Sequence, residues 1–393
     1  MTKHVTLLTS LISARRLIAR TLSSHSCRVS LMNASAFRLT PAPIASAMAH
    51  VPGLNPDFCN GLLLGVIGGF SLFAFFTLII VTRSFRQNDI YDVDHWKLNV
   101  KVPFTTTWMN MGYWTTDNGS PVKDLEQACR NLLHEVLSEA GILRNSSSPK
   151  KLGILDLGIG CGDQSLELAR LVSQGNWDEY RYVGLTLNRS QHRLAARQPF
   201  HQHGKSSHAH YSVDVFQADA ARPQSWGADI LAAVGALRSD AESEERWVLG
   251  LDSLYHFSPS RRPILTYAAA ELDASFMAFD LVLGENVSFR QRIVVKLISG
   301  AMKCPVGAFV TEAVYRAQLK GAGYDDRQIR VRDVTDRVFS GLAAYIERQE
   351  QALKPFGLSV GKYKVAGRLF GWFAQSKVLR AVIVIAPRRE KAT

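Results

Sequence analysis

The feature that most constrains this chain is a glycine-rich turn at residues 154–162, with the sequence Ile-Leu-Asp-Leu-Gly-Ile-Gly-Cys-Gly. An apolar strand runs into the turn, and a helical pattern begins directly after it. Glycine lets the backbone turn tightly and approach a ligand closely, and the first amides of a helix lack partners within the helix. The turn therefore predicts a nucleotide-binding loop built on Gly158, Gly160 and Gly162, with Asp156 at its entrance.

The turn differs from a dinucleotide-binding fingerprint in two ways. That fingerprint has a third glycine three residues after its second, where this chain has Asp163. It also places an acidic residue for the ribose at the end of the next strand, where this chain has Thr186. Both differences argue against an NAD-linked oxidoreductase.

Short apolar runs alternate with helical patterns from Lys151 onward, which is typical of a doubly wound sheet. We expect an α/β fold with a seven-stranded, Rossmann-like sheet. The expected strands are residues 153–157, 182–187, 212–217, 247–252, 276–283, 329–334 and 379–385. The expected helices are residues 122–141, 164–173, 190–198, 262–272, 287–302 and 311–322. The acid-rich stretch Ser239–Arg246 is expected to be a solvated loop or a helix end.

A single transmembrane helix is expected before this domain, at Gly61–Thr82. These 22 residues carry no charge and are long enough to cross a hydrocarbon core of about 30 Å. A buried core helix is the alternative, but a core helix of this length normally has a polar face. Gly61, Gly65 and Gly69 fall on one face, which would permit a homodimer through close helix pairing.

Residues 1–56 contain six Lys and Arg residues and no Asp or Glu. Their charge of +6 is half of the formal net charge of +12. This composition is typical of an organellar presequence, although a disordered basic tail remains an alternative. We therefore expect a single-pass membrane protein of the mitochondrial inner membrane or the endoplasmic reticulum. The chain has no basic stripe with interleaved aromatic residues, so we expect no nucleic-acid partner. The expected parts are a basic segment (1–56), the membrane helix with its flanks (57–86), a lid and helix (87–150) and a cofactor-binding domain (151–393).

Over residues 91–387 the chain resembles the class I S-adenosylmethionine-dependent methyltransferases. The sequence Asp156-x-Gly158-x-Gly160-x-Gly162 matches the first motif of that family. The segment from Thr186 to Gln191 resembles that of the subgroup of cyclopropane fatty-acid synthases, sterol methyltransferases and tocopherol methyltransferases. Ala218-Asp219-Ala220 resembles the third motif, Asn110–Trp114 resembles an aromatic lid, and Tyr315–Tyr324 matches the helix and turn before the sixth strand.

The resemblance implies S-adenosyl-L-methionine as the cofactor and assigns roles to its motif residues. The glycines would hold the methionine moiety, and Asp156 would orient the loop or the ammonium group of the ligand. A purely structural role for Asp156, satisfying loop amides, stays open. Thr186 and Gln191 would replace the usual ribose-binding acid, and Asp219 would accept a hydrogen bond from the adenine. The remaining expected cofactor contacts are Tyr113, Trp114, Ala220 and Asp252.

The segment Leu251–Phe257 follows the fourth strand, where this family places residues that face the substrate. His256 is the candidate general base because its ordinary pKa lies near neutrality, and Tyr255 is the second candidate catalytic residue. A histidine that merely holds the loop is the alternative. The subgroup often has Glu-His at this position, and the absence of the acid favours methyl transfer to oxygen, nitrogen or an activated carbon over cyclopropane formation.

The sequence thus predicts a membrane-anchored methyltransferase that acts on a lipophilic small molecule such as a sterol, a quinone or a phenol. Methylene transfer to an unsaturated acyl chain and a cofactor-binding scaffold without turnover are the alternatives. Four histidines at 201, 203, 208 and 210 suggest a metal site, but no carboxylate or thiol lies beside them, so a solvated loop is expected and no metal is predicted.

Overall fold

The computed structural model describes residues 61–62, 64–76, 106–143, 150–175, 177–200, 210–238, 244–302 and 304–389. The chain divides into two units, residues 1–90 and 91–393. In the first unit, residues 61–62 and 64–76 are helical, with exposed apolar side chains such as Leu64 and Phe70. The rest of the expected membrane segment, residues 63 and 77–82, lies outside the described residues. Within the described part of the chain, no helix combines the length and apolarity needed to cross a bilayer.

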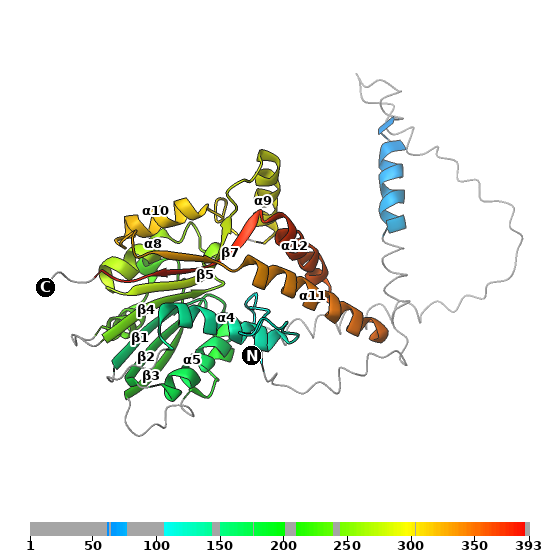
Figure 1. Ribbon diagram of the computed structural model, residues 1–393. Coiled ribbons are helices and arrows are strands. Elements are labelled where there is room, and N and C mark those ends of the chain that lie inside the picture. Colours follow the sequence, from blue (N-terminus) through cyan, green and yellow to red (C-terminus); the bar gives the residue numbers. More distant parts are fainter. Residues whose placement is uncertain are drawn as a thin grey trace, which may run out of the picture. The chain divides into compact units, whose positions relative to one another are not determined.

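The second unit is built on a seven-stranded sheet with the order β3-β2-β1-β4-β5-β7-β6 (Figure 1). The strands from β1 to β5 are parallel, and β7 runs antiparallel to both of its neighbours. The expected seven-stranded α/β sheet is confirmed. The strands are β1 (Lys150–Leu157), β2 (Trp177–Thr186), β3 (His210–Gln217), β4 (Glu244–Leu251), β5 (Ser275–Leu283), β6 (Arg330–Asp333) and β7 (Leu379–Ala386).

Helices cover both faces of the sheet, and each face has its own apolar core. Alternate residues of a strand point to opposite faces, so Ile154 of β1 joins one core while Leu155 joins the other. The first core takes side chains from α4 (Leu125–Ala140), α5 (Asp163–Gln174), α6 (Arg189–Ala195), α9 (Phe289–Ala301), α11 (Thr335–Leu353) and α12 (Lys362–Ser376). The second takes side chains from α7 (Ala228–Gly235), α8 (Arg262–Thr266) and α10 (Glu312–Ala322).

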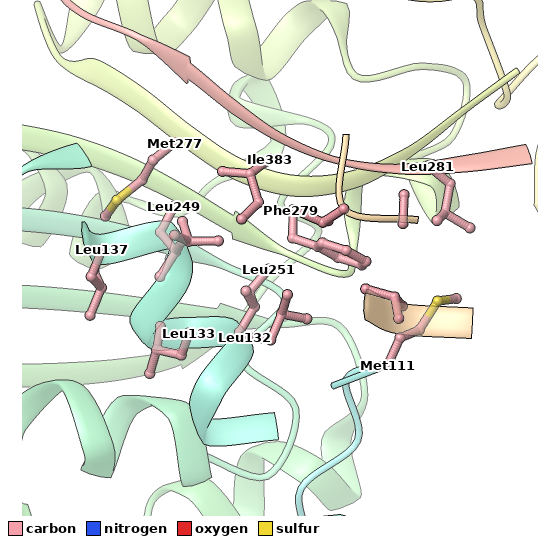
Figure 2. Packing of buried hydrophobic residues seen from close by; sticks show 14 of the residues in the cluster. Met111, Leu132, Leu133, Leu137, Leu249, Leu251, Met277, Phe279, Leu281 and Ile383 are labelled. Atoms are coloured by element: carbon pink, nitrogen blue, oxygen red, sulfur yellow. The ribbon is translucent and has the colours of Figure 1, made fainter. Parts of the chain in front are cut away.

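Helix α4 packs on the sheet through a row of leucines. Figure 2 shows Leu132, Leu133 and Leu137 of α4 facing Leu249 and Leu251 of β4. All three leucines of the helix are fully buried. Burying a leucine side chain contributes about 1.5–3 kcal/mol, so this contact holds α4 firmly over the centre of the sheet.

Two expectations about local structure need correction. Glu244–Arg246 is not a solvated loop, because it forms the start of β4 and pairs with residues 151–153 of β1. The rest of the acid-rich stretch, residues 239–243, lies outside the described residues. Helices α11 and α12 were not predicted; they lie between β6 and β7 and pack against each other.

Candidate functional site

The glycine turn lies where β1 ends, and all three of its glycines have left-handed backbone angles. The φ angles are +83° at Gly158, +59° at Gly160 and +92° at Gly162. Residues with a Cβ atom are disfavoured in this region, so the path of the turn requires glycine. The amides of Gly158 and Ile159 donate to the carbonyl oxygen of Leu185 at 2.8 and 3.0 Å, which ties the turn to the end of β2.

Asp156 is fully buried just before the turn, and its carboxylate is held by protein groups. The Nε2 atom of Gln164 donates to both carboxylate oxygens at 2.8 and 2.9 Å, and the hydroxyl of Tyr182 donates to Oδ2 at 2.7 Å. Burial raises the pKa of Asp156 to about 6, although these donors oppose the rise. Asp156 therefore joins β1, β2 and the first turn of α5, which agrees with an orienting role for the loop.

A strap of residues 106–111 passes over the turn and is tied down at both ends. At one end, Asp163 accepts hydrogen bonds from the amide of Thr107 at 2.9 Å and from its hydroxyl at 2.5 Å. At the other end, the amide of Met111 donates to Oδ2 of Asp252 at 2.8 Å. Between these ties, Met109 lies over Gly160: a Cβ built on that glycine would be 3.3 Å from the Met109 sulfur.

Asp252 follows β4 and brings the strap to the loop that carries the candidate catalytic residues. Its backbone is left-handed, with φ of +60°, which is unusual for a residue other than glycine. Its Oδ1 accepts a hydrogen bond from the hydroxyl of Tyr255 at 2.7 Å, and burial raises its pKa to about 7. The next residue, Ser253, donates through its hydroxyl to the carbonyl of Leu157 at 2.7 Å, so the ends of β4 and β1 are joined.

Thr186 and Gln191 meet at the end of β2, as their spacing in the sequence implies. The hydroxyl of Thr186 donates to Oε1 of Gln191 at 3.1 Å, and Nε2 of Gln191 lies 3.4 Å from the sulfur of Met109. Asn188 caps α6 by accepting hydrogen bonds from two amides of its first turn, which include that of Gln191. The cap and the threonine together fix the position of the glutamine side chain.

A pocket opens between the glycine turn and the strap, with about 410 Å³ of empty space that includes open solvent. It lies at the ends of the neighbouring strands β1 and β4, where the chain leads from β1 to β2 on one side of the sheet and from β4 to β5 on the other. Open α/β sheets bind ligands at such a position. The pocket is lined by residues of the strap, the turn, the start of α5 and the end of β4: Thr107, Trp108, Met109, Asn110, Gly158, Ile159, Gly160, Cys161, Asp163, Gln164, Leu251 and Asp252.

The order of the strands and the position of the pocket can be compared with known proteins. Neither a protein-family model nor a curated protein sequence matches the chain. Solved structures do match. One described as a sarcosine dimethylglycine methyltransferase from Galdieria sulphuraria aligns with a TM-score of 0.50 and 14% identity, over 72% of this chain and 94% of that one. The class I methyltransferase fold is present.

Two further solved structures align at lower TM-scores. The cyclopropane synthase MmaA2 from Mycobacterium tuberculosis gives a TM-score of 0.47 at 14% identity, over 71% of this chain and 90% of that one. The [4+2]-cyclase SpnF gives 0.47 at 17% identity, over 77% of this chain and 94% of that one.

Within this methyltransferase fold, the expected aromatic lid lies elsewhere than predicted. Trp114 is buried with 3% exposure, its indole N–H donates to the carbonyl of Met111 at 2.8 Å, and its ring packs on Tyr345 of α11. Tyr113 is half-buried beside it and does not line the pocket. Of the expected lid, only Asn110 lines the pocket, together with Thr107, Trp108 and Met109 immediately upstream, because Trp114 is packed in the core between α4 and α11.

The expected adenine-binding residues lie at the end of β3, outside the lining of the pocket. Oδ1 of Asp219 accepts a hydrogen bond from the amide of Ala221 at 3.0 Å, and Oδ2 lies 3.5 Å from Nε of Arg222. Ala220 is buried in the second core. The side chain of Asp219 remains 31% exposed, so its carboxylate stays accessible at the same edge of the sheet.

The expected catalytic residues lie beside Asp252 and also outside the lining of the pocket. Tyr255 is buried, and burial raises the pKa of its hydroxyl well above the ordinary value, so it acts as a neutral donor. His256 packs its ring on Tyr255 with the centroids 4.4 Å apart, and its Nδ1 atom is 3.5 Å from the sulfur of Cys304. Partial desolvation lowers the pKa of His256, which keeps the imidazole neutral near pH 7.

The sequence analysis did not identify four residues that shape the site: Gln164 and Tyr182, which hold Asp156, and Thr107 and Met109 of the strap. The run Thr105-Thr106-Thr107-Trp108 directly before the expected lid was the available signal for the strap. Of the four histidines, 201, 203 and 208 lie outside the described residues. Among the residues that the structure describes, no group of His, Cys, Asp and Glu has the arrangement of a metal site.

Proposed function

We propose that the chain is an S-adenosyl-L-methionine-dependent methyltransferase. The observation that carries this proposal is the left-handed glycine turn after β1, facing an open pocket in a sheet of the order 3-2-1-4-5-7-6. The site also fits the cofactor chemically. Gly160 leaves open the space that a side chain would fill. Gln191, held by the buried Thr186, offers a neutral amide where a ribose-binding acid would otherwise stand.

The residues that would hold the cofactor come from three elements. The turn at Gly158–Gly162 would hold its methionine portion, Gln191 its ribose and Asp219 its adenine. The cofactor supplies a methyl group on a positively charged sulfur, which is already reactive toward a nucleophile. The protein mainly has to fix the acceptor in line, and positioning of this kind can lower a barrier by about 7–11 kcal/mol.

His256 is the residue we assign to proton transfer. Its lowered pKa keeps the ring neutral, and Nδ1 lies 3.5 Å from the sulfur of Cys304. In the tautomer whose Nδ1–H donates to that sulfur, Nε2 has the free lone pair that would accept a proton from a hydroxyl or amine substrate. Asp252 positions this loop through the hydroxyl of Tyr255. The strap at residues 106–111 would exclude water from the reacting groups.

We further propose that the protein is anchored in a membrane and methylates a lipophilic small molecule. The apolar segment at residues 61–82 supports the anchor, and its helical residues expose Leu64, Phe70 and Phe73 at 70–72%. Methylene transfer to an unsaturated acyl chain is the second candidate, because the Thr186–Gln191 segment resembles that of cyclopropane synthases. Tyr255 stands where that subgroup often has an acid, which favours simple methyl transfer.

Two experiments test the proposal. Gly160→Val should abolish binding of S-adenosylmethionine in calorimetry while the protein stays folded; retained affinity would refute the assignment of the turn. Incubation of lipid extracts with the full chain and isotopically labelled S-adenosylmethionine, followed by mass spectrometry, should yield a labelled methyl on a heteroatom or conjugated carbon. A ring formed on an acyl chain would favour the second candidate, and binding of the cofactor without any labelled product would favour a scaffold.

A further inference from the structure

Helix α9 carries an apolar stripe on its solvent-facing side. Phe289, Ile293 and Leu297 are spaced four residues apart, so they lie on one face of the helix. Their side chains are 77%, 44% and 71% exposed. The opposite face is occupied, because Val295 and Ser299 are buried against the domain. Single exposed apolar residues are common on proteins, but a continuous stripe of large ones marks a surface that contacts something apolar.

The charges of α9 select what that apolar surface contacts. Arg290, Arg292 and Lys296 are exposed beside the stripe, and the helix contains no acidic residue. An amphipathic helix with large apolar residues on one side and cations flanking them matches the interface of an anionic bilayer, where apolar side chains enter the acyl boundary and cations meet phosphate groups. A partner helix could pack on the apolar stripe without any contact to the cations. The three cations are complementary only to a negatively charged surface.

The position of α9 connects this surface with the candidate site. The helix follows β5 in the chain (Figure 1). Because β5 is parallel to β4, its end lies at the same edge of the sheet as Leu251 and Asp252, which line the pocket. At the far end of the helix, the amide of Cys304 donates to the carbonyl of Ser299 at 2.8 Å, and the sulfur of Cys304 lies 3.5 Å from Nδ1 of His256. The end of α9 is thus linked through Cys304 to the loop proposed to move the proton, on the buried side of the helix that carries the exposed stripe.

We infer that α9 is an interfacial helix that docks the catalytic domain on an anionic membrane surface and presents the His256 loop to molecules dissolved in the bilayer. This inference goes beyond the proposed function, because it concerns a second contact with the membrane, separate from residues 61–82. It does not depend on the reaction catalysed.

Tryptophan quenching by lipid tests the docking directly. The full chain is reconstituted with phosphatidylcholine vesicles that contain acyl chains brominated near the headgroup, with or without phosphatidylserine. The probe is Leu297→Trp, and the matched control is Leu231→Trp, an exposed leucine of α7 on the other face of the sheet. Both variants keep the same seven native tryptophans, so the difference between them reports the added residue.

We expect loss of most of the added emission of Leu297→Trp on vesicles with phosphatidylserine, and little loss for Leu231→Trp. Changing Arg290, Arg292 and Lys296 to Glu in the Leu297→Trp background should abolish this quenching without altering the melting temperature, because all three side chains are exposed. Equal quenching of the two probes, quenching that survives the charge reversal, or a Leu297→Trp emission shielded by protein and untouched by lipid would each overturn the inference. The readout is local to α9, so it is independent of whether residues 61–82 cross the bilayer and of whether methyl transfer occurs.

Discussion

Alanine at Gly158 and alanine at Gly160 should affect different properties of the protein, although the two glycines are neighbours in one turn. Both have left-handed backbone angles, and an alanine there costs about 1–2 kcal/mol, partly offset by the lower entropy of the unfolded chain. At Gly158 the new Cβ would also lie 2.7 Å from the Cβ of Ser253, a contact that forces the loop after β4 to move. Overpacking of this kind adds about 1–3 kcal/mol.

At Gly160 the new Cβ would meet only the flexible side chain of Met109, at 3.3 Å. Gly160→Ala should therefore lower the free energy of unfolding by only about 1 kcal/mol, against about 2–4 kcal/mol for Gly158→Ala. Its methyl group would instead occupy the pocket, so affinity for S-adenosylmethionine should fall by roughly 5- to 150-fold. Gly119→Ala is the matched control, because Gly119 has φ of +80° and open space around it, far along the chain from the turn.

Urea unfolding gives the stability of the three variants, and titration calorimetry gives their affinity for the cofactor. Gly119→Ala should show the small backbone cost with unchanged binding. If Gly160→Ala bound the cofactor normally, or lost as much stability as Gly158→Ala, the account of the turn as a cradle with open space at Gly160 would be wrong.

Three other changes give distinct results. Gln191→Ala should weaken cofactor binding in calorimetry by about 1 kcal/mol, the usual value of a neutral hydrogen bond. It should leave the melting temperature unchanged because the side chain is half-exposed, and a fall in stability with normal binding would contradict the ribose assignment. Burial raises the pKa of Asp252 from 3.8 to about 7, so the folded protein holds that proton more tightly than the unfolded chain, and stability should decline as pH rises from about 4 to about 7. Asp252→Asn should remove this decline, which amounts to at most about 4 kcal/mol in urea unfolding, and an unchanged pH profile would show that the carboxylate titrates normally. Gly341→Ala should lower the melting temperature strongly, because its Cβ would overlap the side chain of Trp114 at 2.1 Å. Gly321→Ala in α10 has open space around it and should not, and equal melting temperatures would show that Trp114 is free to move.

The fold followed from the sequence where the signals were local. Strands such as β5 and β7 are apolar runs bounded by turns, and the glycine turn marks where β1 ends. The helices α11 and α12 were not expected, although Val338, Phe339 and Leu342 have helical spacing. Their apolar faces can be assigned to the core only once β7 is known to lie beside them. The start of β4 at Glu244–Arg246 was missed for a similar reason: its pairing with β1 outweighs the polarity of its residues.

The site residues likewise divide into those predicted from local sequence and those placed by contacts between distant segments. The Thr186–Gln191 pair is close in sequence, and the structure brings the two side chains together. The partners of Asp156 and the position of the strap depend on contacts between distant segments, such as the tie from Met111 to Asp252. For Trp114, the aromatic character suggested a lid, but the bare backbone of Gly341 offers a flat surface that holds the indole in the core.

That contact between Trp114 and α11 bears on how the protein is made. The amide of Trp114 donates to the carbonyl of Arg337 at 2.8 Å, across more than two hundred residues of chain. A nascent polypeptide that has left the ribosome only as far as β5 already contains the whole glycine turn, yet its Trp114 still lacks the helix against which it is wedged. The core contact that holds the segment after the strap is thus completed late in synthesis. A truncation before Thr335 would leave each recognisable motif intact while removing the helix on which Trp114 packs.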